Sequence, residues 1–323
     1  MSATISPDAI LKQLADLWTA EGKQGDAGVL RACSMTLVIL AEAADDPSAL
    51  GETVAALMPE HPARAILVRL SGDGERALAE RVYEQCWMPF GQRRQICCEQ
   101  IEITVSDAAL ADLPSVLLPL AVPDLPVILW CRSARLMGMP ERRDIASVAT
   151  KAIFDSAAVP DDPAEALQRL SALRQTGLLV GDLAWTRLTR WRESLSRFFE
   201  NRDYLARLSA IRTVRVAFPF DLATSGWYLA AWAGNALGAV PSVEAGAPAL
   251  RLDLSSPDFR VSLTREDDRL ITTVDGKSTC ASLSAPTAYL LMREELGIVR
   301  SDPVFDKTLA SAARLAVHSS SEQ

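Results

Sequence analysis

The chain has 323 residues, of which 49% are hydrophobic and 23% are charged, and its formal net charge is −8. Such a composition is typical of a folded globular protein, and the length favours two domains, because one hydrophobic core rarely serves so long a chain. The negative net charge disfavours general binding to nucleic acid, which needs surplus lysine and arginine to neutralise phosphates.

Two segments bear on where the protein acts. Residues 1–6 contain no basic segment followed by an apolar run, so no signal peptide is expected. The longest apolar run, residues 117–130, contains three prolines and Asp124, and it is too short and too interrupted to span a bilayer. The sequence therefore predicts a cytoplasmic protein without a membrane partner.

The side chains that most often bind metals are few or badly spaced. The chain has six cysteines and two histidines, and no two cysteines have the CxxC or CxxxC spacing of a zinc site. Two imidazoles are also too few for a histidine-based metal centre, and they make a Ser-His-Asp triad improbable. We expect no metal, and we expect the cysteines to be reduced, mostly buried and without a structural disulfide.

Strands and helices alternate through the first half of the chain. Residues 34–42 and 63–70 are apolar runs typical of buried strands, and residues 7–21 and 47–58 carry helical spacing and capping signals. This alternation predicts an α/β domain over residues 1–176 with a largely parallel or mixed sheet. Further strands are expected at residues 81–87, 97–105, 126–132 and 151–157, and further helices within residues 107–120 and 163–175.

The second half begins with helices and continues with short strands. An apolar helix is expected over residues 225–238, followed by a strand-rich stretch over residues 249–284 with short turns. We therefore predict an α+β domain over residues 177–323 with an antiparallel meander. Helices are also expected at residues 181–202, 286–296 and 303–317, a strand at residues 211–218, and a frayed polar tail from residue 318.

Motifs for nucleotide binding and catalysis are missing. Gly72-Asp73-Gly74 lacks the third glycine of a dinucleotide loop and precedes a strand, and no Walker sequence occurs. Asp155 ends a predicted strand and is the best single candidate for a ligand crevice, because parallel strands bind ligands at their carboxyl ends. No nucleophile, base and oxyanion donor come together, so neither a catalytic residue nor a cofactor is predicted.

The helix expected at residues 181–202 contains two tryptophans, two adjacent phenylalanines and five arginines. On a helical wheel its apolar residues share one broad face, and Arg187, Arg190 and Arg197 lie together on the adjoining shoulder. The helix could be an ordinary amphipathic core helix. It could instead be an interface, because tryptophan and arginine dominate binding hot spots. The net charge of the chain disfavours a nucleic-acid role for it.

Two stretches of the sequence are unusual enough to compare with known families. They are LPSVLLPLAVPDLPVILW at residues 113–130 and DLAWTRLTRWRE at residues 182–193, which contains Asp182, Trp185 and Trp191. With HPARAILV at residues 61–68, CCEQI at residues 97–101 and IFDS at residues 153–156, they resemble the OpcA family, the glucose-6-phosphate dehydrogenase assembly proteins.

The resemblance implies a non-catalytic protein whose partner is glucose-6-phosphate dehydrogenase, the enzyme that supplies NADPH at the entry of the oxidative pentose phosphate pathway. It implies that the protein promotes assembly of that enzyme and activates it allosterically. The alternative is an enzyme or sensor that binds a small phosphorylated ligand in the strand-end crevice near Asp155. The candidate partner-binding residues are Arg187, Arg190, Arg197, Asp124 and Trp130, and the structural signature is Asp182, Trp185 and Trp191.

Overall fold

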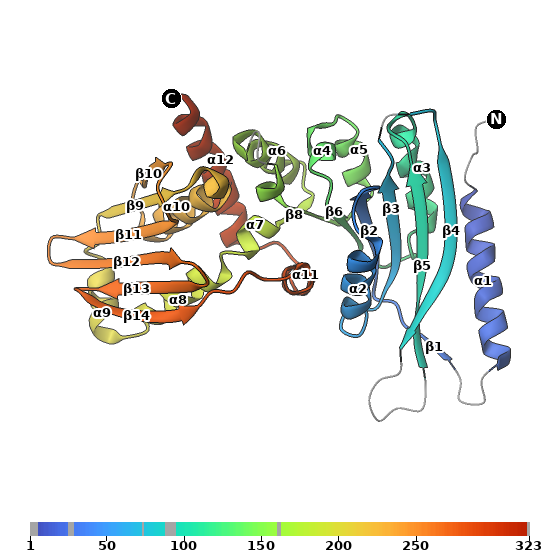
Figure 1. Ribbon diagram of the computed structural model, residues 1–323, viewed down its shortest axis with the longest axis horizontal. Coiled ribbons are helices and arrows are strands. Elements are labelled where there is room, and N and C mark those ends of the chain that lie inside the picture. Colours follow the sequence, from blue (N-terminus) through green and yellow to red (C-terminus); the bar gives the residue numbers. More distant parts are fainter. Residues whose placement is uncertain (1–5, 25–28, 73, 88–94, 160–162, 322–323) are drawn as a thin grey trace. The chain divides into compact units, whose positions relative to one another are not determined.

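The computed structural model describes residues 6–24, 29–72, 74–87, 95–159 and 163–321 (Figure 1). Unit 1 comprises Met1–Phe154 and Leu178–Gly181, and unit 2 comprises Asp155–Gly177 and Asp182–Gln323. The chain crosses from one unit to the other after residues 154, 177 and 181. The single boundary expected after residue 176 lies beside the second crossing, and the division into domains at residues 1–176 and 177–323 stays a prediction.

Unit 1 is built on an eight-stranded sheet in the order β1-β5-β3-β2-β6-β7-β8, with β4 paired to β5. The β4–β5 pair is antiparallel, and the pairs that join β5, β3, β2, β6 and β7 are parallel. A largely parallel sheet was expected, and this expectation is confirmed. The strands are β1 (Val29–Arg31), β2 (Met35–Glu42), β3 (Ala63–Leu70), β4 (Leu78–Trp87), β5 (Gln95–Val105), β6 (Val127–Cys131), β7 (Lys151–Phe154) and β8 (Leu179–Asp182).

The central strands of unit 1 are buried along nearly their whole length. Leu37 and Leu40 on β2 and Ile66 and Val68 on β3 are each 0% exposed, as expected for strands covered on both faces. The connections contain α2 (Pro47–Leu57), η1 (Asp107–Asp112), α3 (Leu113–Leu120), α4 (Ala134–Gly138) and α5 (Arg142–Ser147), and α1 (Pro7–Gln24) packs on β4 and α3.

One charged pair lies inside unit 1. Arg64 is 6% exposed and Glu99 is 3% exposed, and they form an ion pair. The Glu99 carboxylate also accepts a hydrogen bond of 2.7 Å from the Trp18 indole, and the Arg64 guanidinium donates one of 2.7 Å to the Leu120 carbonyl. These hydrogen bonds offset the cost of removing both charges from water, so the pair joins α1 to the sheet.

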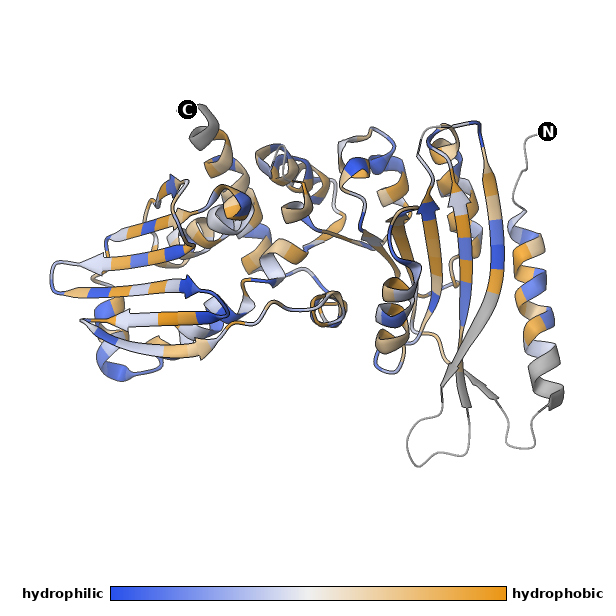
Figure 2. Ribbon diagram, in the orientation of Figure 1, coloured by the Kyte–Doolittle hydropathy of each residue, from blue (hydrophilic) through white to orange (hydrophobic). Residues whose placement is uncertain are grey.

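Unit 2 contains a six-stranded sheet in the order β10-β9-β11-β12-β13-β14. Its pairs are antiparallel except for β9–β10, so the predicted meander is confirmed. Hydrophobic and hydrophilic residues alternate along β12 and the first part of β11 (Figure 2), and buried positions alternate with more exposed ones along β13, as expected for strands with one solvated face. The strands are β9 (Thr213–Phe218), β10 (Ser242–Ala245), β11 (Arg251–Ser256), β12 (Phe259–Glu266), β13 (Arg269–Val274) and β14 (Lys277–Ser282).

Helix α10 (Ala223–Leu237) packs closely on β9 and is buried on nearly all sides. A Cβ atom at Gly226 would lie 2.0 Å from the Phe218 ring, so only glycine permits this approach. The other helices of unit 2 are η2 (Ser156–Ala158), α6 (Pro163–Gln175), α7 (Leu183–Thr186), α8 (Thr189–Phe199), α9 (Arg202–Leu208), η3 (Phe220–Leu222), α11 (Ala288–Gly297) and α12 (Pro303–Ser321).

Several local expectations are wrong. The helix expected at residues 181–202 begins only after β8 and consists of α7 and α8, with a break at Leu188, whose φ and ψ are −87° and 0°, and α9 starts as a separate helix at Arg202. The strand expected at residues 151–157 ends at Phe154, and α12 continues to Ser321 where a frayed tail was expected. Strands β1, β8 and β10 were not expected, because runs of three or four residues carry too little periodicity to be recognised.

The cysteines also differ from expectation, because Cys97 is disulfide-bonded. The backbone register of β4 and β5 places residue 86 directly opposite Cys97. Strand pairing therefore creates a proximity that the spacing along the chain did not reveal. Cys33, Cys98, Cys131 and Cys280 are free, and burial raises the pKa of the Cys98 thiol to about 11 and that of Cys131 to about 12.

In the described part of the chain, no helix combines the length and the apolar character needed to cross a membrane. Within the same residues, no three side chains of His, Cys, Asp or Glu are grouped so that they could hold a metal ion.

Candidate functional site

The carboxylate of Asp182 is the centre of a buried polar cluster in unit 2. Asp182 is 0% exposed. Its Oδ1 atom accepts hydrogen bonds of 3.0 Å from the backbone N–H groups of Ser156 and Ala184. Its Oδ2 atom accepts hydrogen bonds from the Ser156 hydroxyl and, at 2.7 Å, from the Tyr228 hydroxyl. Asp182 therefore caps α7 and at the same time joins α7 to η2 and α10. We call this set the Asp182 cluster.

The cluster continues toward α11 through Thr186. The Thr186 hydroxyl lies 3.1 Å from the Asp182 carbonyl and 2.7 Å from a carboxylate oxygen of Glu295, which is 2% exposed. Sequence analysis found Asp182 but not Ser156, Tyr228 or Glu295. Ser156 and Tyr228 lie 26 and 46 residues from Asp182, and Glu295 lies 109 residues from Thr186, and no local pattern reports such contacts.

Burial raises the pKa of Asp182 to about 6, and the nearby charge of Asp155 acts in the same direction. Hydrogen bonds from Ser156 and Tyr228 oppose this shift. Burial also raises the pKa of the Tyr228 hydroxyl well above its ordinary value, so that group keeps its proton at neutral pH.

We expect the contribution of this carboxyl group to stability to fall as the pH rises from about 4 to 6. The folded-state pKa of about 6 lies above the value of about 4 in an unfolded chain. The folded protein therefore holds the proton more tightly, and the resulting stabilisation is full below pH of about 4 and is lost as the pH passes about 6. Urea unfolding of wild type and Asp182→Asn, measured across this range, checks it. The difference in unfolding free energy, wild type minus variant, should decrease with pH, and a constant difference would contradict a raised pKa.

Arg187, the first member of the arginine shoulder, is engaged within unit 2. Its guanidinium forms two parallel hydrogen bonds of 2.7 and 2.6 Å with the carboxylate of Asp155. The two side chains are 35% and 20% exposed. This fork geometry is the strongest form of an arginine–carboxylate pair. Arg187 therefore has little capacity left for a partner, and both oxygens of Asp155, the proposed crevice residue, are occupied.

Arg190 and Arg197 point to solvent instead. The Arg190 side chain is 70% exposed and lies 3.3 Å from Glu193, an exposed pair of little energetic weight. Arg197 is exposed, and its side chain has no hydrogen-bond or ion-pair partner among the residues that the structure describes. The two arginines are seven residues apart, so they share one face of α8. We call them the α8 arginine pair.

The opposite face of α8 is core. Trp191 is 2% exposed, Leu195 is 6% exposed and Phe199 is 9% exposed. Trp185 on α7 is 4% exposed, and its ring centroid lies 5.8 Å from that of Tyr228. The Arg192 guanidinium stacks 3.5 Å from the centroid of the Trp185 ring. The run at residues 182–193, which we call the signature run, therefore contributes its apolar side chains to the core of unit 2, whereas the α8 arginine pair is exposed to solvent.

Asp124 and Trp130 belong to unit 1. Asp124 is exposed and adopts a positive φ of 64° in the turn between α3 and β6, a conformation that aspartate tolerates better than most residues. Trp130 lies on β6, is 2% exposed and has the Arg132 guanidinium 5.1 Å from its ring. Asp124 thus offers surface to a partner, whereas Trp130 offers almost none.

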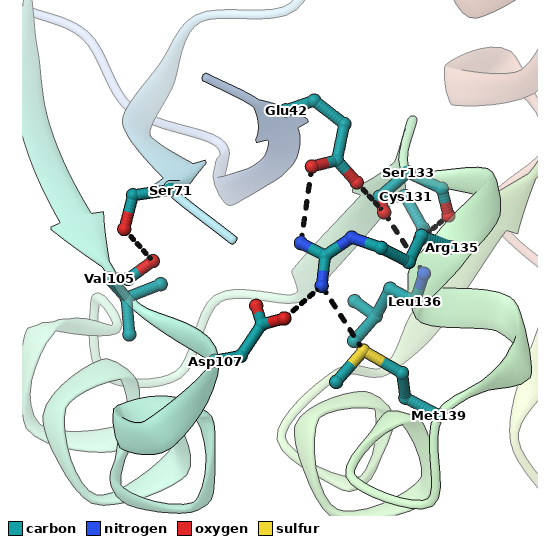
Figure 3. A network of polar contacts seen from close by, with 9 residues as sticks. All are labelled: Glu42, Ser71, Val105, Asp107, Cys131, Ser133, Arg135, Leu136 and Met139. Carbon is teal, nitrogen blue, oxygen red and sulfur yellow. Dashed lines mark hydrogen bonds and ion pairs between the residues drawn. The ribbon is translucent and has the colours of Figure 1, made fainter. Parts of the chain in front are cut away.

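The sheet of unit 1 also suggests a classical ligand position. The order β5-β3-β2-β6-β7-β8 is that of dinucleotide-binding domains, which place the cofactor beyond the carboxyl ends of the two central strands, here β2 and β6. Figure 3 shows Glu42 from β2, Asp107 after β5, and Ser133 and Arg135 after β6 meeting at this edge.

Protein side chains fill this crevice. The Arg135 guanidinium lies 3.2 Å from Glu42, forms a second ion pair with Asp107 and contacts the Met139 sulfur at 3.7 Å. The Ser133 hydroxyl donates a hydrogen bond to Glu42. Burial disfavours the charge of Arg135, but its hydrogen bonds to Asp107 and Glu42 raise its pKa.

These residues do not fit a dinucleotide. Its pyrophosphate needs a glycine-rich turn and free N–H groups at the start of the following helix. Here the turn after β2 is Glu42-Ala43-Ala44-Asp45-Asp46, without glycine, and the Asp46 carboxylate already accepts the Ser48 N–H at the start of α2. The three carboxylates of this turn, Glu42, Asp45 and Asp46, would repel the phosphates. Fold and site thus define an α/β protein of the dinucleotide-binding type whose cofactor crevice is closed by its own side chains.

Family comparison agrees with the resemblance noted in the signature run. Residues 54–172 match the model described as "Glucose-6-phosphate dehydrogenase subunit N-terminal domain". Residues 179–309 match the corresponding C-terminal domain. The two matches cover more than half of the chain, and the protein belongs to the OpcA family of glucose-6-phosphate dehydrogenase subunits.

Two curated relatives carry the description "Putative OxPP cycle protein OpcA". The protein from Synechococcus elongatus is 24% identical over 215 residues, which are 66% of this chain and 46% of the relative. The protein from Nostoc punctiforme is 28% identical over 123 residues, which are 38% of this chain and 26% of the relative. The chain therefore spans less than half the length of these relatives.

Solved structures resemble the chain in fold at low identity. Biliverdin reductase from Synechocystis is 8% identical with a TM-score of 0.46, covering 88% of this chain and 98% of its own. An NAD-binding oxidoreductase from Klebsiella pneumoniae is 11% identical with a TM-score of 0.49, covering 87% and 95%. At these values the likeness carries no conclusion about function.

Proposed function

We propose that this protein is a non-catalytic subunit of glucose-6-phosphate dehydrogenase in the cytoplasm. It binds the enzyme, promotes assembly of the active oligomer and activates it allosterically. Family membership supports the partner. The closed crevice supports a role without dinucleotide chemistry, since Glu42, Arg135 and Asp107 occupy the place where a cofactor would lie.

The physical basis of activation would be linkage between binding and assembly. A protein that binds the active oligomer more tightly than the other forms shifts the population toward the active oligomer. The size of the shift equals the difference in binding free energy between the forms. Activation without a change in oligomer distribution would require a second conformational state within one oligomer.

The observation that carries the proposed contact surface is the division of the two faces of α8. Trp191 anchors one face in the core, and the exposed Arg190 and Arg197 occupy the other. Exposed arginines on a rigid helix lose little conformational freedom of the backbone on binding, and arginine is enriched in hot spots. Asp124 is a second candidate, on unit 1. Arg187 is assigned a structural role through Asp155.

The test uses the purified chain and the dehydrogenase from the same organism. We expect the two to co-elute in size-exclusion chromatography and the chain to increase dehydrogenase activity in a saturable titration. The chain alone should oxidise no glucose 6-phosphate with NADP⁺ or NAD⁺. Separate elution together with unchanged activity would refute the proposal.

Removing the α8 arginine pair should weaken the complex without unfolding the protein. Arg190→Ala and Arg197→Ala are each expected to change stability by no more than about 0.5 kcal/mol, because both side chains are exposed. At least one should weaken binding by about 2 kcal/mol, or roughly 30-fold in the dissociation constant. Isothermal titration with the dehydrogenase measures this. Arg143→Ala, at an exposed arginine of unit 1, is the matched control. Wild-type affinity in both α8 variants would place the contact elsewhere.

The alternative function, an enzyme or sensor with a phosphorylated ligand near Asp155, has no supporting observation. A ligand there would have to displace Arg187 from both carboxylate oxygens at once. It would also meet the negative charge of Asp155 rather than a free cation. The structure therefore favours the partner role over a ligand crevice at this position.

A further inference from the structure

The solvated face of the unit 2 sheet contains a depression of about 520 Å³, lined by residues of β9, β10, β11 and β12 and of the segment before β11. This volume lies in the range of about 300–1,000 Å³ that is usual for small-molecule sites. The lining includes three arginines, Arg215, Arg251 and Arg260, and two carboxylates, Glu244 and Asp253. The charge of these five side chains is therefore +1, on a chain with a net charge of −8.

Strand register arranges these residues in rows across the sheet. Ser255 on β11 lies opposite Thr213 on β9 and opposite Arg260 on β12, which gives one row of two hydroxyls and a guanidinium. Asp253 lies opposite Arg215 in the next row on the same face. Neighbouring strands are about 4.8 Å apart, and successive rows on one face are about 7 Å apart.

Hydrogen bonding differs between the rows. Arg251 and Glu244 lie in a third row, each opposite Ala217. Arg251 donates bonds of 2.9 and 2.7 Å to one oxygen of Asp253, and Arg215 is paired with one oxygen of Glu244. The guanidinium of Arg260 and the hydroxyls of Thr213 and Ser255 have no side-chain partner among the residues that the structure describes. The first row therefore offers free donors, whereas the second and third rows offer carboxylate oxygens held in place by arginines.

We propose that this depression binds a sugar phosphate. The phosphate would accept hydrogen bonds from Arg260, Ser255 and Thr213, a donor set suited to an anionic oxygen group. The free oxygens of Asp253 and Glu244 would accept hydrogen bonds from sugar hydroxyls, which carboxylates do well. The row spacing matches the reach of a phosphorylated sugar from its phosphorus to its ring hydroxyls.

The asymmetry of the site selects against simpler anions. A ligand with negative charge at both ends would meet the carboxylates of the second and third rows. A neutral sugar would leave the guanidinium of Arg260 without an anion. The ligand that satisfies all three rows carries one anionic group and several neutral hydroxyls. This inference does not depend on the dehydrogenase, because the site lies within unit 2 of the isolated chain.

Isothermal titration of the purified chain with glucose 6-phosphate tests the proposal. We expect one saturable site in wild type, and an affinity at least tenfold lower in Arg260→Gln. Arg269→Gln is the matched control, because Arg269 is a 63% exposed arginine on the same face of β13, outside the depression. It should bind within about twofold of wild type. Glucose and inorganic phosphate should each bind at least tenfold more weakly than glucose 6-phosphate.

Several results would overturn this inference. They are no saturable binding by wild type, equal affinity for inorganic phosphate and glucose 6-phosphate, and unchanged affinity in a folded Arg260→Gln variant. Loss of dehydrogenase binding in Arg260→Gln without any binding of glucose 6-phosphate would also overturn it, because the face would then be a protein contact. Circular dichroism of both variants establishes that they are folded, which is expected because both arginines are exposed.

Discussion

Asp182→Ala should lower the free energy of unfolding of unit 2 by about 3–5 kcal/mol, near the upper end for a single substitution. The change removes the acceptor of four hydrogen bonds and leaves the donors of Ser156, Ala184 and Tyr228 without a partner in the protein. Each buried donor left unsatisfied costs about 1–3 kcal/mol, and partial rehydration of the small cavity reduces the sum. Urea unfolding at neutral pH, followed by circular dichroism, measures the effect.

A surface aspartate provides the control for this experiment. Asp221 lies in η3, close to the start of α10, and is exposed. Asp221→Ala should change the free energy of unfolding by no more than about 0.5 kcal/mol. If Asp182→Ala were as mild as this control, the cluster would not contribute to stability, and its four hydrogen bonds would have to be replaced readily by water.

Trp191→Ala should destabilise unit 2 by about 3–5 kcal/mol, because it removes a large buried side chain and leaves a cavity. Trp191 is 2% exposed on the core face of α8, next to Leu195. Its loss should also detach the helix that carries the α8 arginine pair. Urea unfolding followed by circular dichroism is the suitable measurement, since the substitution removes a tryptophan fluorophore.

Arg190→Ala is the matched control, because it changes the neighbouring residue of the same helix. Its side chain is 70% exposed, so the free energy of unfolding should stay within about 0.5 kcal/mol of wild type. Comparing the two unfolding free energies shows which face of α8 contributes to the packing of unit 2. A loss below about 1 kcal/mol in Trp191→Ala would show that the core around α8 collapses to fill the cavity, contrary to our expectation.

The Asp182 and Trp191 variants, with their exposed controls, test whether the signature run serves to hold unit 2 together. Asp182, Trp185 and Trp191 hold α7 and α8 in unit 2 through hydrogen bonds and burial. Arg190 and Arg197 are exposed, and we propose them as partner contacts. A variant that binds poorly because it is unfolded can thus be distinguished from one that folds normally and has lost a contact.

The sequence by itself determined the features that depend on neighbouring residues. The apolar runs of β2 and β3 predicted buried parallel strands, and the turns and alternation after residue 249 predicted the meander. The missing glycines predicted that no dinucleotide binds, which stays a prediction. The run at residues 182–193 indicated the family. All of these signals lie within a few residues of one another, where periodicity and turn chemistry act.

The tertiary structure alone decided which charged groups are free and which are satisfied. Arg187, Arg190 and Arg197 share one shoulder of a helical wheel, yet only Arg187 meets Asp155, because η2 and the end of α7 pack against each other within unit 2. Strand pairing likewise placed residue 86 opposite Cys97 and brought Arg260 into the row of Thr213 and Ser255. Such contacts join residues far apart in the chain, so their energies are set by packing that no local pattern encodes.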